Sequence, residues 1–352
     1  MSTPRIEISL RKIAHNAHTL KDLYGAKGIQ ISAVTKVVCG EPQVAETLLD
    51  CGIRTLADSR IANIRRMRDA GVEATFLLLR GPSLSQAADV VRFADLSLNS
   101  DLSVVRELSR HAVEQQSIHK IILMVELGDL REGVMPADLP GAVEQVLKLD
   151  GVSLVGIGAN LACFGGIKPD DANMGYLSEL ARDVEVEFGL ELTHVSGGNS
   201  ANYAWFMSTG DVGMINDLRI GESIYLGCET LLREPIPGLF TDAFTLVAEV
   251  IESRTKPSVP YGQSGQNAAG DLPEFKDLGD MRRVILAIGS QDVLVSGLIP
   301  RAEIEILGAS GDHTVVDARE IEYKVGDEVA FGLNYGALQS AMTSPYVHKV
   351  VI

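Results

Sequence analysis

The chain has 352 residues, a mass of 37.8 kDa and a formal net charge of −16 at pH 7. This length exceeds that of a typical compact domain, so we expect two domains or one large barrel with an appended part. The acidic balance argues against nucleic-acid binding, which depends on basic side chains that neutralise phosphates. The same charge favours attraction of cationic small molecules.

Membrane and secretory features are missing from the sequence. No apolar run approaches the roughly 20 residues of a membrane helix, and the N-terminus has no basic region followed by an apolar stretch. The cysteines are scattered without a C-x-x-C pair, and the histidines follow no known ligand spacing. We therefore expect a cytoplasmic protein with reduced thiols and no metal site.

Short apolar runs alternate with helical patterns over the first two thirds of the chain. Strands are expected at Ile31–Thr35, Arg54–Ala57, Thr75–Leu79, Ala94–Leu98, Lys120–Leu127 and Val152–Gly158, then near Leu192–Ser196 and Leu218–Ile220. Helices are expected over residues 10–23 with Ser9 as N-cap, from Pro42, and at 60–70, 101–115, 137–149 and 171–188. This alternation predicts a (β/α)8 barrel. A doubly wound sheet is the competing fold, but its glycine-rich fingerprint after the first strand is missing.

The pattern changes near Pro235–Gly238, and long helical periodicity is absent beyond it. Short alternating runs follow at Phe244–Ile251, Arg283–Ile288, Ala302–Leu307, Thr314–Val316, Glu328–Phe331 and Val347–Ile352. These runs predict a β domain. We place the barrel at residues 10–234 and the β domain at 235–352, with an N-terminal strand from residues 1–9. The polar segment 255–280 is expected to be a long excursion from the core.

Functional side chains of a barrel gather where its strands end. Lys36 directly follows the first strand, where burying its charge is costly. It is either a lysine that extends along a loop to water, or an amine with a lowered pKa that forms a Schiff base. Position alone leaves both readings open.

The later strand ends carry further polar and glycine residues. Arg131 follows the fifth strand, Asn160 ends the sixth, Asn199 and Ser200 follow the seventh, and Arg219 and Gly221 end the eighth. Backbone N–H groups and a hydroxyl at a helix start are suited to an anion. Barrels repeatedly build phosphate sites after strands seven and eight. Together with a Schiff-base lysine, this suggests pyridoxal phosphate.

These motifs, in this order, resemble the alanine racemase fold, the fold-type III pyridoxal-phosphate enzymes, over nearly the whole chain. Besides the strand-end residues, the resemblance includes the opening Ile6–Asn16, the turn Pro260-Tyr261-Gly262 and the pair Asn334-Tyr335. The segments TKVVCG, LGDLREG and KPSVP look closest to the ornithine-racemase-like branch.

The resemblance implies roles for particular residues around the cofactor. Lys36 would hold the cofactor as an aldimine and act as one base, and Tyr261 of the partner subunit would be the second base on the opposite face. This arrangement requires a homodimer with shared active sites. The phosphate would be bound by Ser200 beside Asn199, by backbone N–H groups around Gly221 and Glu222, and by Tyr335. Arg219 would face the pyridine nitrogen and leave it unprotonated, which suits a racemase better than an aminotransferase.

The resemblance also suggests residues that contact the substrate. Arg131 would lie near the cofactor's phenolic oxygen or the substrate carboxylate. Asn160 stands where alanine racemases carry a histidine, and Asp292 would lie near the substrate. Three acidic residues near Arg131 could recognise a distal ammonium: Glu126, Asp129 and Glu132.

The expected activity is racemisation of ornithine, lysine or another polar amino acid. One alternative is a fold-type III lyase, either an aldolase or a decarboxylase. No metal pattern supports an aldolase, and Arg219 argues against a decarboxylase, which would use an acidic partner at the pyridine nitrogen. The other alternative is a non-catalytic cofactor carrier, and the β domain argues against it.

Overall fold

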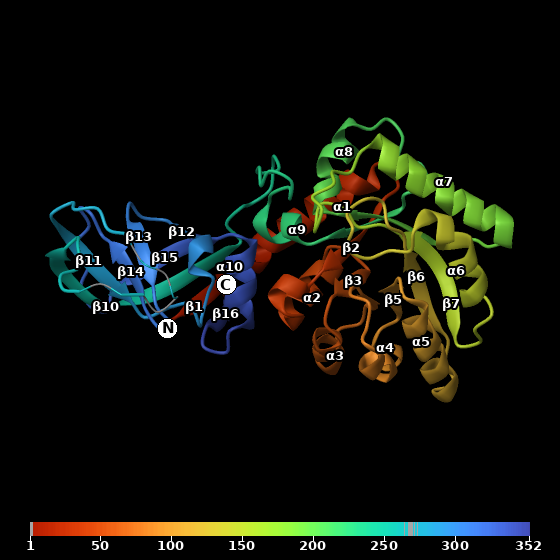
Figure 1. The fold of residues 1–352 in the computed structure, drawn as a ribbon, viewed down its shortest axis with the longest axis horizontal. Helices are drawn as coiled ribbons and strands as arrows, with labels where there is room; N and C mark the ends of the chain where they lie inside the picture. The colour runs from red at the N-terminus through yellow and green to blue at the C-terminus, as the bar shows by residue number, and fades with distance from the viewer. Residues whose placement is uncertain (1–2, 264, 267–269, 271, 273) are drawn as a thin grey trace. The chain divides into compact units, whose positions relative to one another are not determined.

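The computed structural model describes residues 3–263, 265–266, 270, 272 and 274–352. The chain forms two compact units (Figure 1). One unit comprises Arg11–Thr241, and the other combines the N-terminal residues up to Leu10 with Asp242–Ile352. In the part of the chain that is described, no helix has the length and apolar character needed to cross a membrane.

The first unit is a closed barrel of eight parallel strands. The strands are β2 (Gln30–Val34), β3 (Thr55–Asp58), β4 (Thr75–Leu78), β5 (Leu96–Asn99), β6 (His119–Met124), β7 (Val152–Gly158), β8 (His194–Asn199) and β9 (Asp217–Ile220). They pair in chain order, and β9 closes the barrel against β2. The predicted (β/α)8 barrel is confirmed.

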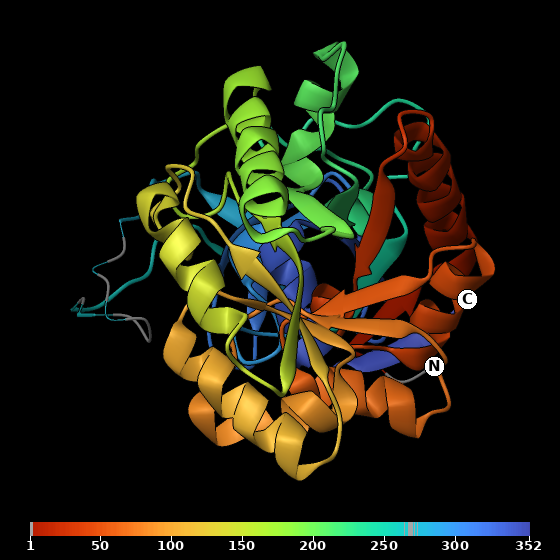
Figure 2. The same ribbon diagram turned by 90° about the vertical axis from the view of Figure 1, so that its right-hand side faces the viewer.

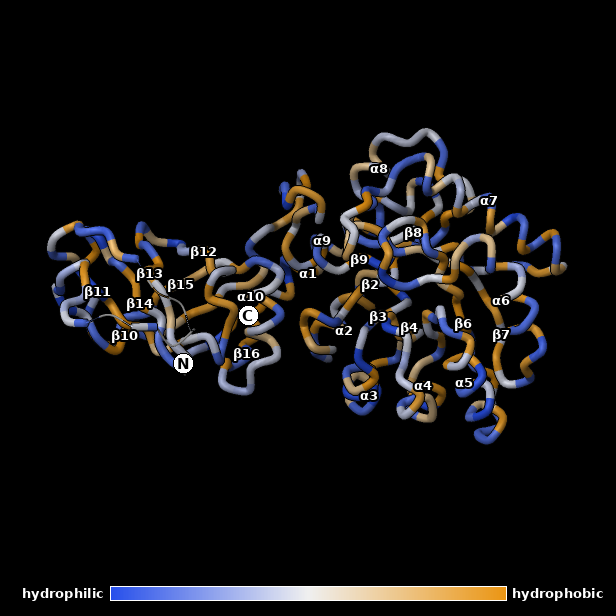
Figure 3. Tube along the Cα trace, viewed as in Figure 1, coloured by the Kyte–Doolittle hydropathy of each residue, from blue (hydrophilic) through white to orange (hydrophobic). Residues whose placement is uncertain are grey.

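Helices surround the strands on the outside of the barrel (Figure 2). They are α1 (Leu10–Gly25), α2 (Pro42–Asp50), α3 (Ile61–Asp69), α4 (Ala87–Phe93), α5 (Leu102–Glu114), α6 (Leu139–Val146), α7 (Asp171–Phe188), α8 (Tyr203–Ser208) and α9 (Glu222–Leu226). Their hydropathy alternates along the chain, whereas strands such as β6 and β7 are mainly hydrophobic (Figure 3). This is the pattern of helices that bury one face against a barrel.

Local sequence signals set the helix boundaries. The Asp101 side chain caps α5 by accepting a hydrogen bond from the Ser103 backbone N–H. Helix α7 begins with a capping box between Asp170 and Asn173 and ends at Gly189, whose φ of 63° suits glycine. Each cap satisfies backbone groups that the helix itself leaves unpaired.

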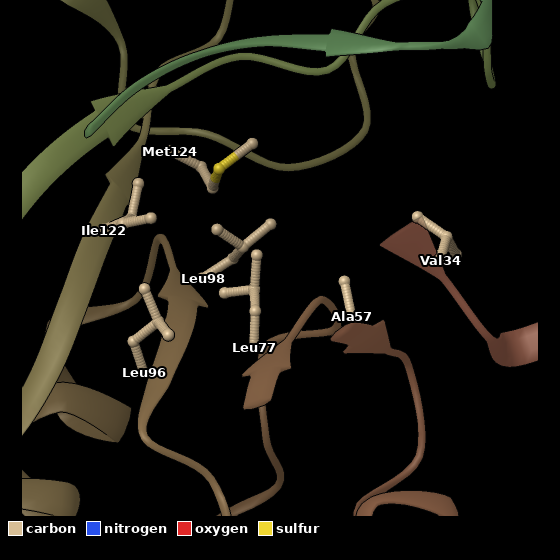
Figure 4. Packing of buried hydrophobic residues seen from close by; sticks show 7 residues of the cluster. All are labelled: Val34, Ala57, Leu77, Leu96, Leu98, Ile122 and Met124. Carbon is tan, nitrogen blue, oxygen red and sulfur yellow. The ribbon is translucent and has the colours of Figure 1, made fainter. Parts of the chain in front are cut away.

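One side of the barrel interior is apolar. Its buried side chains come from β2 to β6 and form one cluster of Val34, Ala57, Leu77, Leu96, Leu98, Ile122 and Met124 (Figure 4). The other side, on β2, β8 and β9, buries the polar residues Ser32, Ser196, Asp217 and Arg219. The barrel is therefore stabilised by packing on one side and by hydrogen bonds on the other.

The second unit is a sheet with one helix against it. Its strands are β1 (Arg5–Ile8), β10 (Phe244–Pro257), β11 (Asp280–Leu286), β12 (Leu298–Pro300), β13 (Glu305–Ala309), β14 (Thr314–Asp317), β15 (Glu328–Leu333) and β16 (His348–Val351). Strand β1 pairs antiparallel with β10 and parallel with β16. The helix is α10 (Tyr335–Thr343).

Three differences from the sequence-based prediction concern the boundary between the units, the polar segment and a helix of the second unit, and no ranges were predicted for the short elements β12, α4, α8 and α9 either. The division between the units falls after Thr241 rather than after residue 234, because the intervening segment bonds back to the barrel unit. The Ile236 N–H donates to the Gly227 carbonyl at 2.8 Å, and the Phe240 N–H donates to Asn16 Oδ1 at 2.8 Å. Strands β10 and β11 also extend into the segment expected to be an excursion, which leaves residues 258–279 to connect them.

The third difference is helix α10. It was not predicted, because the sequence of this unit shows no long helical periodicity. The helix has only nine residues, and its buried face consists of Ala337, Leu338, Ala341 and Met342. So short a helix repeats its apolar pattern barely twice. Its start is nevertheless specified locally, because Asn334 Oδ1 accepts a hydrogen bond from the Ala337 N–H at 2.9 Å.

The apolar side of the barrel gives a stability prediction. Leu77 is 1% exposed, so Leu77→Ala should leave a cavity and lower the free energy of unfolding by about 2–5 kcal/mol. Leu84→Ala makes the same change at a side chain that is 52% exposed, and it should cost less than about 1 kcal/mol. Urea denaturation measures both. Equal losses for the two variants would contradict the assignment of Leu77 to the core.

Candidate active site

Lys36 begins a short 3-10 turn (Lys36–Val38) directly after β2. Burial lowers the pKa of its amine, and the nearby charges of Arg131 and Arg219 act in the same direction. Cys163 and Asp58 oppose them. A lysine amine in such surroundings is more readily neutral, and therefore nucleophilic, near neutral pH.

A cavity of about 520 Å³ lies beside Lys36. Its lining comes from the carboxyl ends of β2 to β6 and comprises Lys36, Ser59, Leu79, Arg80, Gly81, Leu98, Asn99, Ser100, Met124, Arg131 and Glu132. Leu98 and Met124 also belong to the apolar cluster of Figure 4, so the cavity continues that side of the barrel. A second cavity of about 570 Å³, between Arg54 and Thr75, lies where strands begin. The volume and mixed lining of the first cavity suit a small molecule.

Arg219 is buried inside the barrel. Its guanidinium donates to Ser196 Oγ at 2.5 Å, to the Ala159 carbonyl at 2.8 Å and to Asn160 Oδ1 at 3.2 Å. Burial lowers the pKa of Arg219 to about 10, and the carboxylate of Asp217 opposes this shift. The group stays positively charged at neutral pH and is fixed in orientation.

The carboxylate of Asp217 opposes the positive charge of Arg219, and the hydroxyl group of Ser196 connects the two side chains. The Asp217 carboxylate accepts hydrogen bonds from Ser32 Oγ at 2.6 Å and from Ser196 Oγ at 2.5 Å. Ser196 thus joins the carboxylate to the guanidinium of Arg219. All four side chains are buried, so this network holds a fixed positive charge in a low-dielectric interior.

The loops after β7, β8 and β9 meet beside Arg219. Asn199 Nδ2 donates to Asn160 Oδ1 at 3.2 Å and to the Leu161 carbonyl at 2.9 Å. Ser200 Oγ accepts from the Ser223 N–H at 3.3 Å, which links the last two loops. Among the described residues, the buried Nδ2 of Asn160 has no hydrogen-bond partner.

Gly221 and Glu222 lie where β9 leads into α9. A Cβ on Gly221 would lie 3.0 Å from the Val34 Cβ, so glycine lets β9 approach β2 closely. Burial raises the pKa of the Glu222 carboxyl, and Arg233, whose Nη1 lies 2.7 Å from it, opposes this shift.

Arg131 and Glu132 form an ion pair at the cavity. Arg131 Nη1 also lies 2.6 Å from Cys163 Sγ. The guanidinium of Arg131 therefore links the loop after β6 to the loop after β7, and the carboxylate of Glu132 is the acidic group among the residues that line this cavity.

The other two acidic candidates support loops. Glu126 Oε1 accepts hydrogen bonds from the N–H groups of Gly128 and Leu130 at 2.6 and 3.0 Å. Asp129 accepts from three consecutive N–H groups, of Cys163, Phe164 and Gly165, at 2.9–3.2 Å. Burial alone would raise the pKa of Asp129, but these bonds outweigh it and lower the pKa. We therefore assign both carboxylates to loop support, which leaves Glu132 as the acidic candidate for a ligand contact.

A chain of buried polar groups leads from the cavity into the wall of the barrel. Asn99 Nδ2 donates to the Ser97 carbonyl at 3.0 Å and to Ser97 Oγ at 2.9 Å. Ser97 Oγ lies 2.8 Å from His119 Nε2. Burial lowers the pKa of His119 to about 4, so its imidazole is neutral at pH 7.

Three predicted site residues belong to the second unit. Tyr261 is 93% exposed there, Tyr335 is the first residue of α10, and Asp292 Oδ2 accepts a hydrogen bond from the Gly289 N–H at 2.9 Å, which closes a turn. The remaining predicted residues all lie at strand ends of the barrel unit: Lys36, Arg131, Asn160, Asn199, Ser200, Arg219, Gly221 and Glu222. Among the residues described, no group of three or more His, Cys, Asp or Glu side chains is placed to hold a metal.

Sequence reasoning missed the Asp217 network and the Asn99 chain. A signal for each was present, because Asp217 and Arg219, like Ser97 and Asn99, are two residues apart on a strand and so share one face. Polar pairs at this spacing within buried strands are uncommon and need partners.

The chain is similar to known racemases along its whole length. Residues 8–228 match the family model for the alanine racemase N-terminal domain. An ornithine racemase of Acetoanaerobium sticklandii is 39% identical and a lysine racemase of Thermotoga maritima is 41% identical, each over 99% of both chains. The structure of an alanine racemase of Clostridium difficile 630 superposes with a TM-score of 0.77 at 19% identity, covering 100% of this chain and 96% of the other.

A parallel eight-stranded barrel with a partly buried lysine after its first strand, followed in the chain by a β domain, is the arrangement of fold-type III pyridoxal-phosphate enzymes. The chain belongs to the alanine racemase family and is a pyridoxal-phosphate-dependent amino-acid racemase. The resemblance stated from the motifs is confirmed. The site fits this cofactor, since it combines a partly buried amine at Lys36, a fixed guanidinium at Arg219 and the unpaired donor of Asn160.

The depressed pKa of His119 gives a prediction for stability against pH. An unfolded histidine binds a proton near pH 6.5, whereas folded His119 does so only near pH 4, so the unfolded state takes up a proton first as the pH falls. As the pH falls from 6.5 to 4, the free energy of unfolding of the wild type should therefore decrease by about 3 kcal/mol more than that of His119→Gln. Urea denaturation at several pH values measures this difference. Gln in place of the exposed His313 should leave the pH profile of the wild type unchanged.

Proposed function

We propose that this racemase interconverts the enantiomers of ornithine, lysine or a closely related basic amino acid. Two bases would carry the proton: Lys36 of one subunit and Tyr261 of the partner. The observation that carries the proposal is the Lys36 amine, whose pKa burial lowers, beside a cavity that also holds the Arg131–Glu132 ion pair. The names of the two full-length relatives support the substrate class.

Bound pyridoxal phosphate draws electron density from the substrate α-carbon and thereby makes its hydrogen acidic. Lys36 Nζ would take this proton on one face, because burial lowers its pKa and so makes the neutral, proton-accepting form of the amine more available. The phenol of Tyr261 would deliver a proton on the other face. Two bases on opposite sides of one plane invert the configuration.

Arg219 would direct the chemistry toward racemisation. Its guanidinium is fixed by Ser196 and Ala159 and remains charged at neutral pH, so it would not pass a proton to the pyridine nitrogen. An unprotonated ring is a weaker electron sink, which restrains transamination. Ser200, with Asn199, the backbone at Gly221 and Glu222, and Tyr335, would bind the phosphate.

The cavity would orient a basic substrate by its charges. The guanidinium of Arg131 suits the α-carboxylate, and the carboxylate of Glu132 suits a distal ammonium. Asn160, whose Oδ1 accepts a hydrogen bond from Arg219, and Asp292 would also contact the substrate. The net charge of −16 would favour the approach of a cationic amino acid.

The functional unit would be a homodimer. Tyr261 lies on the surface of its own unit, 93% exposed, and a side chain so placed is available to complete the site of another subunit. Each active site would then need residues of two chains, and a monomer would be inactive.

A substrate panel tests the proposed class. Purified protein with added pyridoxal phosphate should racemise ornithine and lysine with kcat/KM at least about tenfold above that for alanine and serine. Chiral chromatography measures the enantiomers, and exchange of the α-hydrogen in deuterium oxide reports the proton transfer. Cleavage or decarboxylation without enantiomer formation would instead support a lyase.

Mixed dimers test the two bases and the shared site together. Lys36→Ala should lose both the visible absorbance of bound cofactor and activity, whereas Tyr261→Phe should keep the absorbance and lose racemisation. Neither variant alone has a complete site, but a mixed dimer has one site with both native residues. Mixing equal amounts and allowing subunits to exchange should restore about a quarter of wild-type activity. No recovery in a mixture shown to contain mixed dimers would argue against Tyr261 acting across the interface.

A further inference from the structure

Asp58 ends β3, the strand that pairs with β2 in front of Lys36. Val34 of β2 lies opposite Ala57 of β3, and Figure 4 labels both residues on these neighbouring strands. The pairing continues for one more residue, because the Thr35 N–H donates to the Ala57 carbonyl at 2.8 Å. Asp58 therefore stands beside Thr35, the residue that precedes Lys36.

The carboxylate of Asp58 holds the turn that carries Lys36, residues 35–40, which we call the lysine turn. Thr35 Oγ1 donates to Asp58 Oδ2 at 2.8 Å, and both side chains are fully buried. The Thr35 carbonyl in turn accepts from the N–H groups of Val38 and Gly40 at 3.1 and 3.2 Å. A displaced Thr35 would therefore move the backbone from which the Lys36 amine extends.

The other oxygen of Asp58 holds the start of α3. Asp58 Oδ1 accepts from the Arg60 N–H at 2.9 Å and from Asn63 Nδ2 at 3.0 Å. A Cβ on Gly40 would lie 2.8 Å from the Asn63 carbonyl oxygen, so the end of the lysine turn packs closely against this helix. The Asp58 carboxylate thus joins the lysine turn to α3.

The surroundings of Asp58 suit a carboxylate rather than a carboxylic acid. Its Oδ1 faces two N–H donors and its Oδ2 faces a hydroxyl group, so a negative charge is satisfied at both oxygens. Burial raises the pKa of Asp58, and the bonds from Arg60, Thr35 and Asn63 oppose that shift. Hydrogen bonds to the charged form favour it, so we expect a buried negative charge here.

The Lys36 amine experiences charges of both signs. The charged and titratable groups that act on it belong to several elements of the barrel and are Asp58, Arg131, Cys163, Arg219 and Glu222. Burial lowers the pKa of Lys36, and Arg131 and Arg219 lower it further, whereas Asp58 raises it. Asp58 combines this charge with a hydrogen bond to the lysine turn, so its place relative to Lys36 is fixed.

We propose that Asp58 is a positioning residue for Lys36: its carboxylate fixes the lysine turn and partly offsets the positive charges of Arg131 and Arg219 at the amine. This inference rests on the proposed function, which assigns the cofactor-binding amine to Lys36. It extends that function by naming the group that controls how readily this amine is protonated.

Asp58→Asn tests the charge, since asparagine keeps the shape of the side chain. Its carbonyl oxygen can accept from the two N–H donors at the start of α3, and its amide can donate to Thr35 Oγ1. The Thr35 hydrogen can then go to the Ala57 carbonyl, 3.3 Å away. Loss of the negative charge makes protonation of Lys36 less favourable, so the amine should stay neutral to a lower pH than in the wild type.

Competitive acetylation of the full-length protein without cofactor measures this change, because acetic anhydride reacts with the neutral amine. Lys36 lines the cavity, so a small reagent can reach it, and mass spectrometry of its peptide gives the rate at each pH. At a pH below the wild-type midpoint, the Asp58→Asn variant should react about threefold faster or more. A midpoint that is unchanged or higher would overturn the electrostatic role.

Asp101→Asn is the matched control. Asp101 Oδ1 accepts from the Ser103 N–H at 2.8 Å before α5, as Asp58 Oδ1 accepts from the Arg60 N–H before α3. Asp101 follows β5, three strands from β2 in the barrel, and its side chain is exposed to screening solvent. The control removes the same charge farther away, and the rate at Lys36 should stay within about 1.5-fold of the wild type.

Thr35→Val tests the positioning, because valine has a similar shape and cannot donate to Asp58. The dissociation constant of pyridoxal phosphate, from titration of the visible absorbance, should rise about threefold or more, without a shift of the acetylation midpoint to lower pH. Thr35→Ser keeps the hydroxyl group and should bind the cofactor as the wild type does. Wild-type affinity in the valine variant, or equal losses in both variants, would overturn the positioning role.

Asp58→Ser decides the electrostatic role if Asp58→Asn does not fold, as judged by thermal unfolding. Serine is uncharged, and its hydroxyl group can still accept from the Arg60 N–H because it forms the same local turn as aspartate, though more weakly. This variant should also react faster with acetic anhydride below the wild-type midpoint. Folded Asp58→Ser with the wild-type midpoint would overturn the role.

A separate measurement distinguishes this inference from the proposed function. Borohydride reduction of the cofactor-loaded wild type, followed by mass spectrometry, identifies the lysine that holds the cofactor. Attachment to a lysine other than Lys36 would overturn both. Attachment to Lys36, with Asp58→Asn unchanged in acetylation and Thr35→Val unchanged in cofactor affinity, would overturn the role of Asp58 alone.

Discussion

The structure depends on one buried charge, the guanidinium of Arg219. A charge inside a barrel is tolerated only when hydrogen bonds and an opposite charge replace the water it has lost. Here Ser196, Ala159 and Asn160 bond it directly, and Asp217 balances it through Ser196. This requirement explains why β8 and β9 carry polar residues at positions that β4 to β6 fill with leucine, isoleucine and methionine.

The packed side and the hydrogen-bonded side of the barrel meet at β2. Lys36 follows β2, which contributes Val34 to the apolar cluster and Ser32 to the polar network. Its amine therefore lies between an apolar floor and fixed positive charges, and both conditions favour the neutral form. The lowered pKa of Lys36 thus results from its burial in the barrel together with the charges of its neighbours.

The sequence predicts the architecture well because the barrel repeats a strong signal. Each of its eight strands was expected within a few residues of its observed position, and Lys36 and Arg219 were identifiable as strand-end residues. The sequence could not separate the roles of Glu126, Asp129 and Glu132, since all three are acidic and close in the chain. The fold brings backbone N–H groups to the carboxylates of Glu126 and Asp129, and these contacts are not encoded in a local pattern. The direction of the Asn99 amide likewise depends on contacts that span β5 and β6.

Strand β1 has a consequence for how the chain assembles during synthesis. It pairs with β10 and β16, whose residues leave the ribosome more than 230 residues later. The barrel can close while β1 still exposes both of its hydrogen-bonding edges, and such edges are prone to pair with other chains. The second unit is therefore complete only after β16 has been synthesised. Translation that stops before β16 would yield a chain with a closed barrel and an unpaired edge on β1.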